Sequence, residues 1–115
     1  MCTVNINNVG VDRPRDQLCL FGKLEWSHED YSLVKVSFDS FPCNLVADTL
    51  NLLERLPFEK NDLIELPGLY IRHEGLADKE EFNKILRQLF AIALASVPEA
   101  FIEIDVTIKE EWEEA

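Results

Sequence analysis

Residues 78–97, DKEEFNKILRQLFAIALASV, decide the fold of this chain. Asp78 is followed three positions later by Glu81, which is the spacing of a capping box, and acids here complement the positive end of a helix dipole. Apolar residues then recur at helical spacing: Phe82, Ile85, Leu86, Leu89, Phe90 and Ala93. The opposite face carries Asn83, Lys84, Arg87 and Gln88. This pattern predicts an amphipathic helix.

The second half of the same helix, from Leu89 to Ala95, has no polar residue on any face. A helix that is apolar all round is buried all round, and this run is far shorter than the ~20 residues that span a bilayer. Pro98 ends the helix. We therefore expect Ala91, Leu94 and Ala95, on the side away from the sheet, to pack against the first helix or against a second chain.

Upstream, residues 17–26 and 31–39 alternate apolar and polar side chains, which predicts two strands. The four-residue polar turn between them predicts an antiparallel hairpin. Gly22 interrupts the apolar face of the first strand, which is typical of a bulge. The pattern in residues 1–16 is weak, and it predicts an edge strand over residues 3–9.

The middle of the chain predicts a first helix and a second hairpin. Ser40-Phe41-Pro42 is expected to open the helix, since proline suits a first turn, and Pro57 to end it. Its apolar stripe consists of Leu45, Val46, Leu50, Leu52, Leu53 and Leu56. Pro67-Gly68 has the signature of a type II turn, so residues 62–66 and 69–73 are expected to pair as short strands.

The last strand is expected over residues 100–112, where apolar and polar residues alternate strictly. Its apolar face holds Ile102, Ile104, Val106 and Ile108. The predicted order is β-β-α-β-β-α-β. The whole chain, 1–115, is expected to form one α+β domain: a two-layer sandwich with a mostly antiparallel sheet of about five strands and two helices on one face. Residues 110–115 form an acidic tail.

Charge narrows the classes of partner. The net charge is −11, from 22 acidic against 11 basic residues, which argues against direct binding of nucleic acid or an anionic membrane. We expect a basic protein partner. Three cysteines, Cys2, Cys19 and Cys43, match no zinc or redox spacing, and Met1 to Asn5 shows no signal-peptide pattern. A reducing cytoplasm is therefore the expected location.

Catalytic signatures are absent from the sequence: it has no glycine-rich phosphate loop, nucleophile elbow or metalloprotease motif. Cys43, in the first turn of the expected helix, and His73, at a strand end, are the alternatives that would support an enzyme. A packed thiol and a solvent-facing histidine are the simpler interpretations. Residues 28–30, His-Glu-Asp, are interpreted as a solvated turn. We expect no metal, no cofactor and no catalytic activity.

The predicted binding surface is the polar face of the last strand with the tail. Its residues are Phe101, Glu103, Asp105, Thr107, Glu110, Glu111 and Trp112. Aromatic and acidic side chains together suit a protein interface. The first hypothesis is a small inhibitor or immunity-type neutraliser of a basic, nucleic-acid-handling protein. The alternative is a homodimeric assembly or secretion-chaperone-like protein, paired through the second helix.

Overall fold

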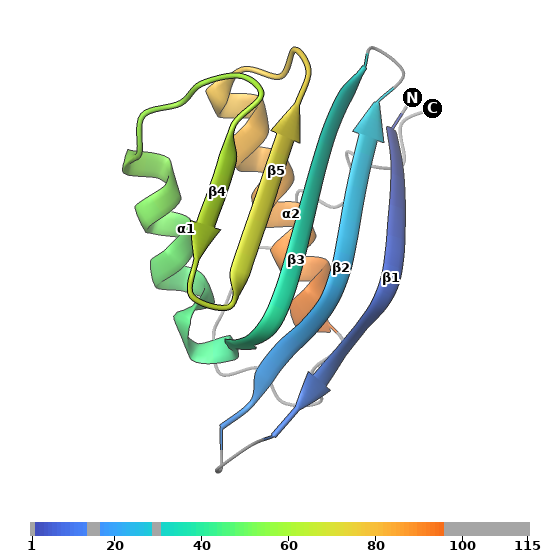
Figure 1. The fold of residues 1–115 in the computed structure, drawn as a ribbon, viewed down its shortest axis with the longest axis vertical. Helices are drawn as coiled ribbons and strands as arrows, with labels where there is room; N and C mark the ends of the chain where they lie inside the picture. Colours follow the sequence, from blue (N-terminus) through green and yellow to red (C-terminus); the bar gives the residue numbers. More distant parts are fainter. Residues whose placement is uncertain (1, 14–16, 29–30, 96–115) are drawn as a thin grey trace.

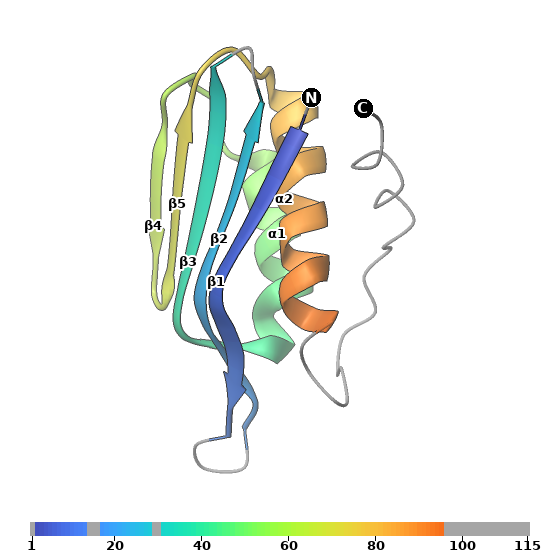
Figure 2. The ribbon, with the colours of Figure 1, turned by 90° about the vertical axis from the view of Figure 1, so that its right-hand side faces the viewer.

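The computed structural model describes residues 2–13, 17–28 and 31–95. In chain order the elements are β1 (Cys2–Asp12), β2 (Cys19–His28), β3 (Ser32–Pro42), the 3-10 helix η2 (Cys43–Leu45), α1 (Val46–Arg55), β4 (Leu63–Leu66), β5 (Leu69–Glu74) and α2 (Lys79–Ala95). The strands form one layer, and both α-helices cover the same face of it (Figures 1 and 2). The predicted two-layer α+β fold is confirmed.

The sheet has the order β1-β2-β3-β5-β4, and every neighbouring pair is antiparallel. β3 lies at the centre, and β1 and β4 are the edges of the described sheet. The weakly predicted strand over residues 3–9 is present as the 11-residue β1. The strand predicted over residues 100–112 lies outside the described residues.

Alternation along β3 explains why its residues form the centre of the sheet. Val34, Val36 and Phe38 point toward the helices and are at most 5% exposed. Most of their cross-strand partners on β2 and β5 are also apolar, for example Leu24 and Ile71 opposite Val36, although His73 lies opposite Val34. One face of the sheet is therefore core and the other is open, which is the arrangement expected of a half-buried antiparallel sheet.

Two β-bulges lie side by side around Gly22. In β3, Asp39 and Ser40 together oppose the single residue Phe21, because Gly22 pairs with Phe38 while Leu20 pairs with Phe41. In β1, a matching extra residue lies between Asn7 and Gly10. Gly22 has φ 114°, a value that side chains disfavour. The register does change beside Gly22, but the extra residues lie in β3 and β1, the two neighbours of β2, and not in β2 itself, where the bulge was predicted.

The prediction that Ser40-Phe41-Pro42 opens the first helix is wrong. These residues continue β3, and the helical segment begins only at Cys43 with η2. The reason is the bulge: Ser40 has φ 54°, which turns Phe41 back into the core, where it is 2% exposed. Burial of this aromatic ring outweighs the preference of proline for a first helical turn.

The hairpin of β4 and β5 turns at Pro67-Gly68, as predicted. Leu66 pairs with Leu69, and Gly68 has φ 75°. A side chain at Gly68 would approach the backbone oxygen of Asp39 to 2.9 Å. The Asp39 N–H donates to the Gly68 carbonyl at 2.9 Å, so the turn is fastened against the bulge of β3.

Helix α2 begins where the sequence predicts. The Glu81 N–H donates to Asp78 Oδ1 at 2.8 Å, which caps the first turn. Ala91 and Leu94 are 7% and 6% exposed, while Ala95 is exposed. The burial of Ala91 and Leu94 therefore does not require a second chain. Gln88, which was expected on the polar face, is instead buried at 5% exposure.

Candidate functional site

The surface predicted to bind a partner falls on residues that the structure does not describe. Its members are Phe101, Glu103, Asp105, Thr107, Glu110, Glu111 and Trp112. Their role therefore stays a prediction. The described residues offer two other surfaces: the open face of the sheet, and a groove on the helical layer.

The open face of the sheet carries charges of both signs. Its charged residues are Lys23, Glu25, Lys35, Asp39, Glu65, Arg72 and Glu74. Among the described residues two ion pairs lie on it: Lys35 with Glu25 at 3.9 Å, between β3 and β2, and Arg72 with Glu74 at 3.0 Å, along β5. Three bases against four acids leave this face nearly neutral. The negative charge of the chain is therefore concentrated elsewhere.

Two aromatic rings are also exposed on the open face, Phe21 at 41% and Tyr70 at 43%. Phe21 lies over Gly10, because a side chain built there would come within 2.5 Å of its ring. An aromatic ring over an edge-strand glycine is a packing device of sheets. Phe21 is exposed, but its position over Gly10 gives it a structural role.

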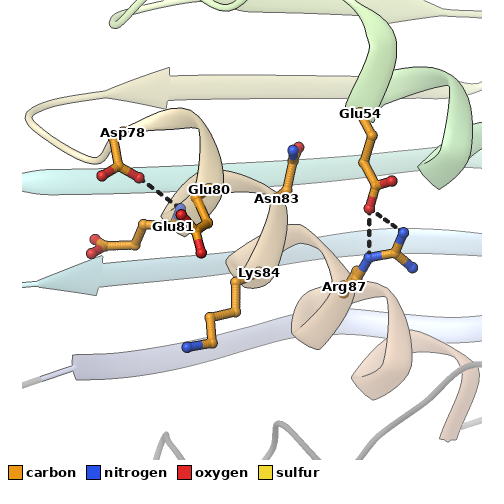
Figure 3. A pocket seen from close by; sticks show the side chains of 7 residues that line it. All are labelled: Glu54, Asp78, Glu80, Glu81, Asn83, Lys84 and Arg87. Atoms are coloured by element: carbon orange, nitrogen blue, oxygen red, sulfur yellow. Dashed lines mark hydrogen bonds and ion pairs between the residues drawn. The ribbon is translucent and has the colours of Figure 1, made fainter.

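The groove lies on the outer side of the helical layer, between the end of α1 and the first turns of α2 (Figure 3). It encloses about 530 Å³. Its lining residues are Glu54, Asp78, Glu80, Glu81, Asn83, Lys84 and Arg87. All but Glu54 come from α2 or the residue before it, because helical spacing brings one polar face of α2 to the solvent side.

One ion pair closes one end of the groove. Arg87 Nε donates to Glu54 Oε1 at 3.0 Å, and Arg87 Nη2 donates to the same oxygen. Figure 3 shows Glu54 reaching from α1 to meet Arg87 on α2. The carboxylate of Glu54 is thus neutralised, and α1 is held against α2.

The other end of the groove is acidic. Asp78, Glu80 and Glu81 lie in and before the first turn of α2, with Lys84 as the remaining cation of the lining. The start of a helix is the positive end of its dipole, which is where acidic side chains are favoured. Four acids and two bases give the lining a net charge of −2. An open, acidic groove of this size suits a lysine or arginine side chain of another protein.

Sequence reasoning identified these groove residues only as solvent-facing. The missing information was the contact between helices: Glu54 and Arg87 are 33 positions apart, and nothing in either helical pattern states that they meet. The sequence feature that could have indicated the groove is the cluster of three acids at the start of α2, which was interpreted only as helix capping.

His73 is placed differently from the prediction, which had it facing water at a strand end. It is 1% exposed, on the core face of β5 beside Leu69 and Ile71. Its ring packs between Phe82 at 4.9 Å and Phe58 at 5.5 Å between centroids. Within the described part of the chain, neither ring nitrogen has a hydrogen-bond partner. Burial lowers the pKa of His73, opposed by the nearby carboxylate of Asp62, so the imidazole is held neutral.

The thiols of Cys19 and Cys43 are free and buried, at 4% and 0% exposure. Burial raises the pKa of both thiols, assisted by Asp12 at Cys19 and by Cys19 at Cys43. A thiolate nucleophile needs the opposite, a lowered pKa and access to substrate. This environment supports the packed-thiol interpretation of Cys43.

Metal ligands do not cluster in the described ranges: no group of three or more His, Cys, Asp or Glu is arranged to hold an ion. His28 stacks on Trp26, with ring centroids 6.1 Å apart. No helix within residues 2–13, 17–28 and 31–95 combines the length and apolar character needed to cross a membrane. Comparison with protein-family models, curated proteins and solved structures gives no match.

Proposed function

We propose that this chain is a small acidic binding module, without catalytic activity, that neutralises a basic partner such as a nucleic-acid-handling protein. The acidic groove at the start of α2 is the observation that supports it best. At its acidic end the carboxylates of Asp78, Glu80 and Glu81 lie beside one cation, Lys84, while the two other charged residues of the lining, Glu54 and Arg87, pair with each other. A basic surface that binds phosphates is complementary to such a groove.

The whole-chain charge supports the same proposal. A net charge of −11 attracts a basic partner over a Debye length and raises the rate of encounter. The nearly neutral open sheet face contributes little to this attraction. The groove and the predicted surface of residues 101–112 are thus the two places where the acidic charge would act. The free thiols Cys19 and Cys43 support a reducing, cytoplasmic setting.

Capture of partners from a lysate of the source cells tests the proposal. Wild-type chain is compared with Glu80→Lys/Glu81→Lys, which reverses the acidic end of the groove. The matched control is Glu59→Lys/Glu65→Lys, which makes the same charge change at two exposed residues outside the groove. Circular dichroism establishes that each variant is folded, since acids at a helix start contribute to stability.

The expected result is a basic partner that the wild type and the control retain and the groove variant loses. Its association rate falls steeply between low and moderate salt. A third variant, Glu103→Lys/Asp105→Lys, distinguishes the two candidate sites. If only this variant loses the partner, the binding site lies on the predicted last strand and not in the groove. The proposal is contradicted if all variants retain the partner equally, or if the association rate does not change with salt concentration.

A further inference from the structure

Helix α1 carries two apolar stripes, and only one of them is used by the core. Val46, Leu50 and Leu53 are buried at 0–4% exposure. Leu45, directly before the helix, and Leu52, in its second half, are one heptad apart and each 44% exposed. A surface helix needs one apolar stripe to pack on its sheet. The second stripe has no packing role within the described residues.

The orientation of α1 is fixed, so the second stripe cannot turn inward. Glu54 is tied to Arg87 of α2, and Lys79 Nζ donates to the Leu56 carbonyl just beyond α1. At 3.6 residues per turn, Leu52 and Glu54 lie nearly on opposite sides of the helix. The Leu45–Leu52 flank therefore faces away from α2.

This flank lies at an edge of the molecule. α1 covers the β4 side of the sheet (Figures 1 and 2), and β4 is an edge strand paired only with β5 among the described strands. A four-residue edge strand with unpaired backbone groups is a place where another chain can approach. The helix flank and the strand edge form one continuous side of the molecule.

We propose that this side of the molecule, centred on Leu52 of α1 with Leu45 at its margin, is the contact between two copies of this chain. Charge on α1 favours a second copy as the occupant. Asp48, in the first turn, and Arg55, in the last, are both exposed. When the two-fold axis of an antiparallel pair passes near Leu52, the Leu52 side chains of the two copies meet and Asp48 of each copy lies across from Arg55 of the other, so the flank is complementary to itself.

The proposal goes beyond binding of a basic partner and uses a different face from the groove. It also differs from the dimer predicted through the second helix, where Ala91 and Leu94 are already buried. A ten-residue helix is about 15 Å long, and a standard interface buries about 800 Å² per partner. We therefore expect a weak dimer whose population rises with concentration, with the β4 edge adding area beside the helices.

Analytical ultracentrifugation of the full chain over a wide concentration range tests the dimer. The mass is expected to rise from the 13.3 kDa of one chain toward twice that value. Leu52→Glu places a charge in the contact and should weaken association about 30-fold or more. The matched control is Leu76→Glu, because Leu76 is 67% exposed and lies in the loop before α2; this variant should associate like the wild type.

A charge swap distinguishes the antiparallel pair from non-specific association of exposed apolar residues. Asp48→Arg and Arg55→Asp should each weaken association, and the double variant should restore it, because the opposite charges again face each other. Circular dichroism shows whether each variant is folded. A wild type that stays at 13.3 kDa at every concentration overturns the proposal. So does equal weakening by Leu52→Glu and Leu76→Glu, or a double variant that fails to recover.

Discussion

At the scale of single residues, His73 has an environment that differs from the predicted one, because it is buried and was expected to face water. It follows Leu69 and Ile71 at the alternate positions of β5, so the strand period itself places it in the core. A histidine there is stable only when neutral, because a buried charge without a partner is expensive. Among the described residues, neither ring nitrogen has a hydrogen-bond partner, so no hydrogen bond offsets that penalty on protonation.

We predict that His73 makes the fold sensitive to acid. Burial lowers its folded pKa below the ordinary 6.5, Asp62 opposes this shift and Lys60 adds to it. Below 6.5 the unfolded chain therefore binds a proton that the folded chain does not. Stability is complete above that pH and falls as pH falls toward the folded pKa, by up to about 1.4 kcal/mol per pH unit. Urea unfolding from about pH 7.5 to about pH 5 measures this loss.

The variant His73→Phe separates this residue from the carboxylates that also titrate in acid. Phenylalanine keeps the aromatic packing with Phe58 and Phe82 and removes the titrating group, so the variant should lose less stability with falling pH. His28→Gln is the control, since it removes the only other histidine and should keep the slope of the wild type. Identical slopes for wild type and His73→Phe would show that His73 does not carry the effect.

At the scale of elements, the start of α2 rests on one side chain. Asp78 Oδ1 accepts the N–H of Glu81 at 2.8 Å, and the Asp78 carbonyl accepts the N–H of Phe82 at 2.8 Å. Phe82 packs on His73, so the first turn of α2 also closes the core over β5. The cap therefore positions both the acidic groove and the aromatic cluster beneath it.

We predict that Asp78→Ala lowers the free energy of unfolding by about 1 kcal/mol, the usual value of an N-cap. Asp78→Asn keeps a capping oxygen and should lose only the smaller dipole contribution. Urea denaturation of both variants beside the wild type measures the difference. Equal destabilisation by alanine and asparagine would mean that the charge of Asp78, and not its hydrogen bond, is what matters.

The elements with a clear period were predictable from the sequence, and the exceptions have physical causes. Apolar alternation located β2 and β3, and the capping spacing located the start of α2. Phe41 could not be placed, because its position depends on Ser40 adopting a positive φ, which no local pattern signals. Gln88 lies in the core because α2 is covered on more sides than a one-sided stripe implies.

The candidate site was less predictable than the fold. Its acids were visible in the sequence, but the groove exists only because α1 and α2 lie together on one sheet face. The pair Glu54 and Arg87 is a tertiary contact between two separate helical patterns. A sequence pattern specifies which face of each helix is polar, and it leaves open which polar residues meet.

At the scale of the whole molecule, charge opposes compactness. A net charge of −11 on 115 residues repels itself more strongly in the folded state than in the expanded chain. We predict that the free energy of unfolding rises when sodium chloride increases from about 0.01 M to about 0.15 M, as the Debye length falls from about 30 to about 8 Å. Thermal unfolding at each salt concentration measures the change.

Potassium chloride at the same concentrations is the control for this effect. Because screening depends on ionic strength and not on the particular cation, both salts should raise the melting temperature equally. A melting temperature that falls with either salt would mean that favourable ion pairs, such as the one between Glu54 and Arg87, outweigh the overall repulsion.

The central place of β3 has a consequence for how the chain folds. β3 pairs with β2 through a short connection, but it meets β5 only after α1 and β4 have been passed, with Val36 opposite Ile71. Contacts between residues so distant in sequence form slowly, because the intervening chain must first be closed into a loop. The β1–β2–β3 meander can therefore form first, and docking of the β4–β5 hairpin onto β3 would limit the rate at which the native protein appears.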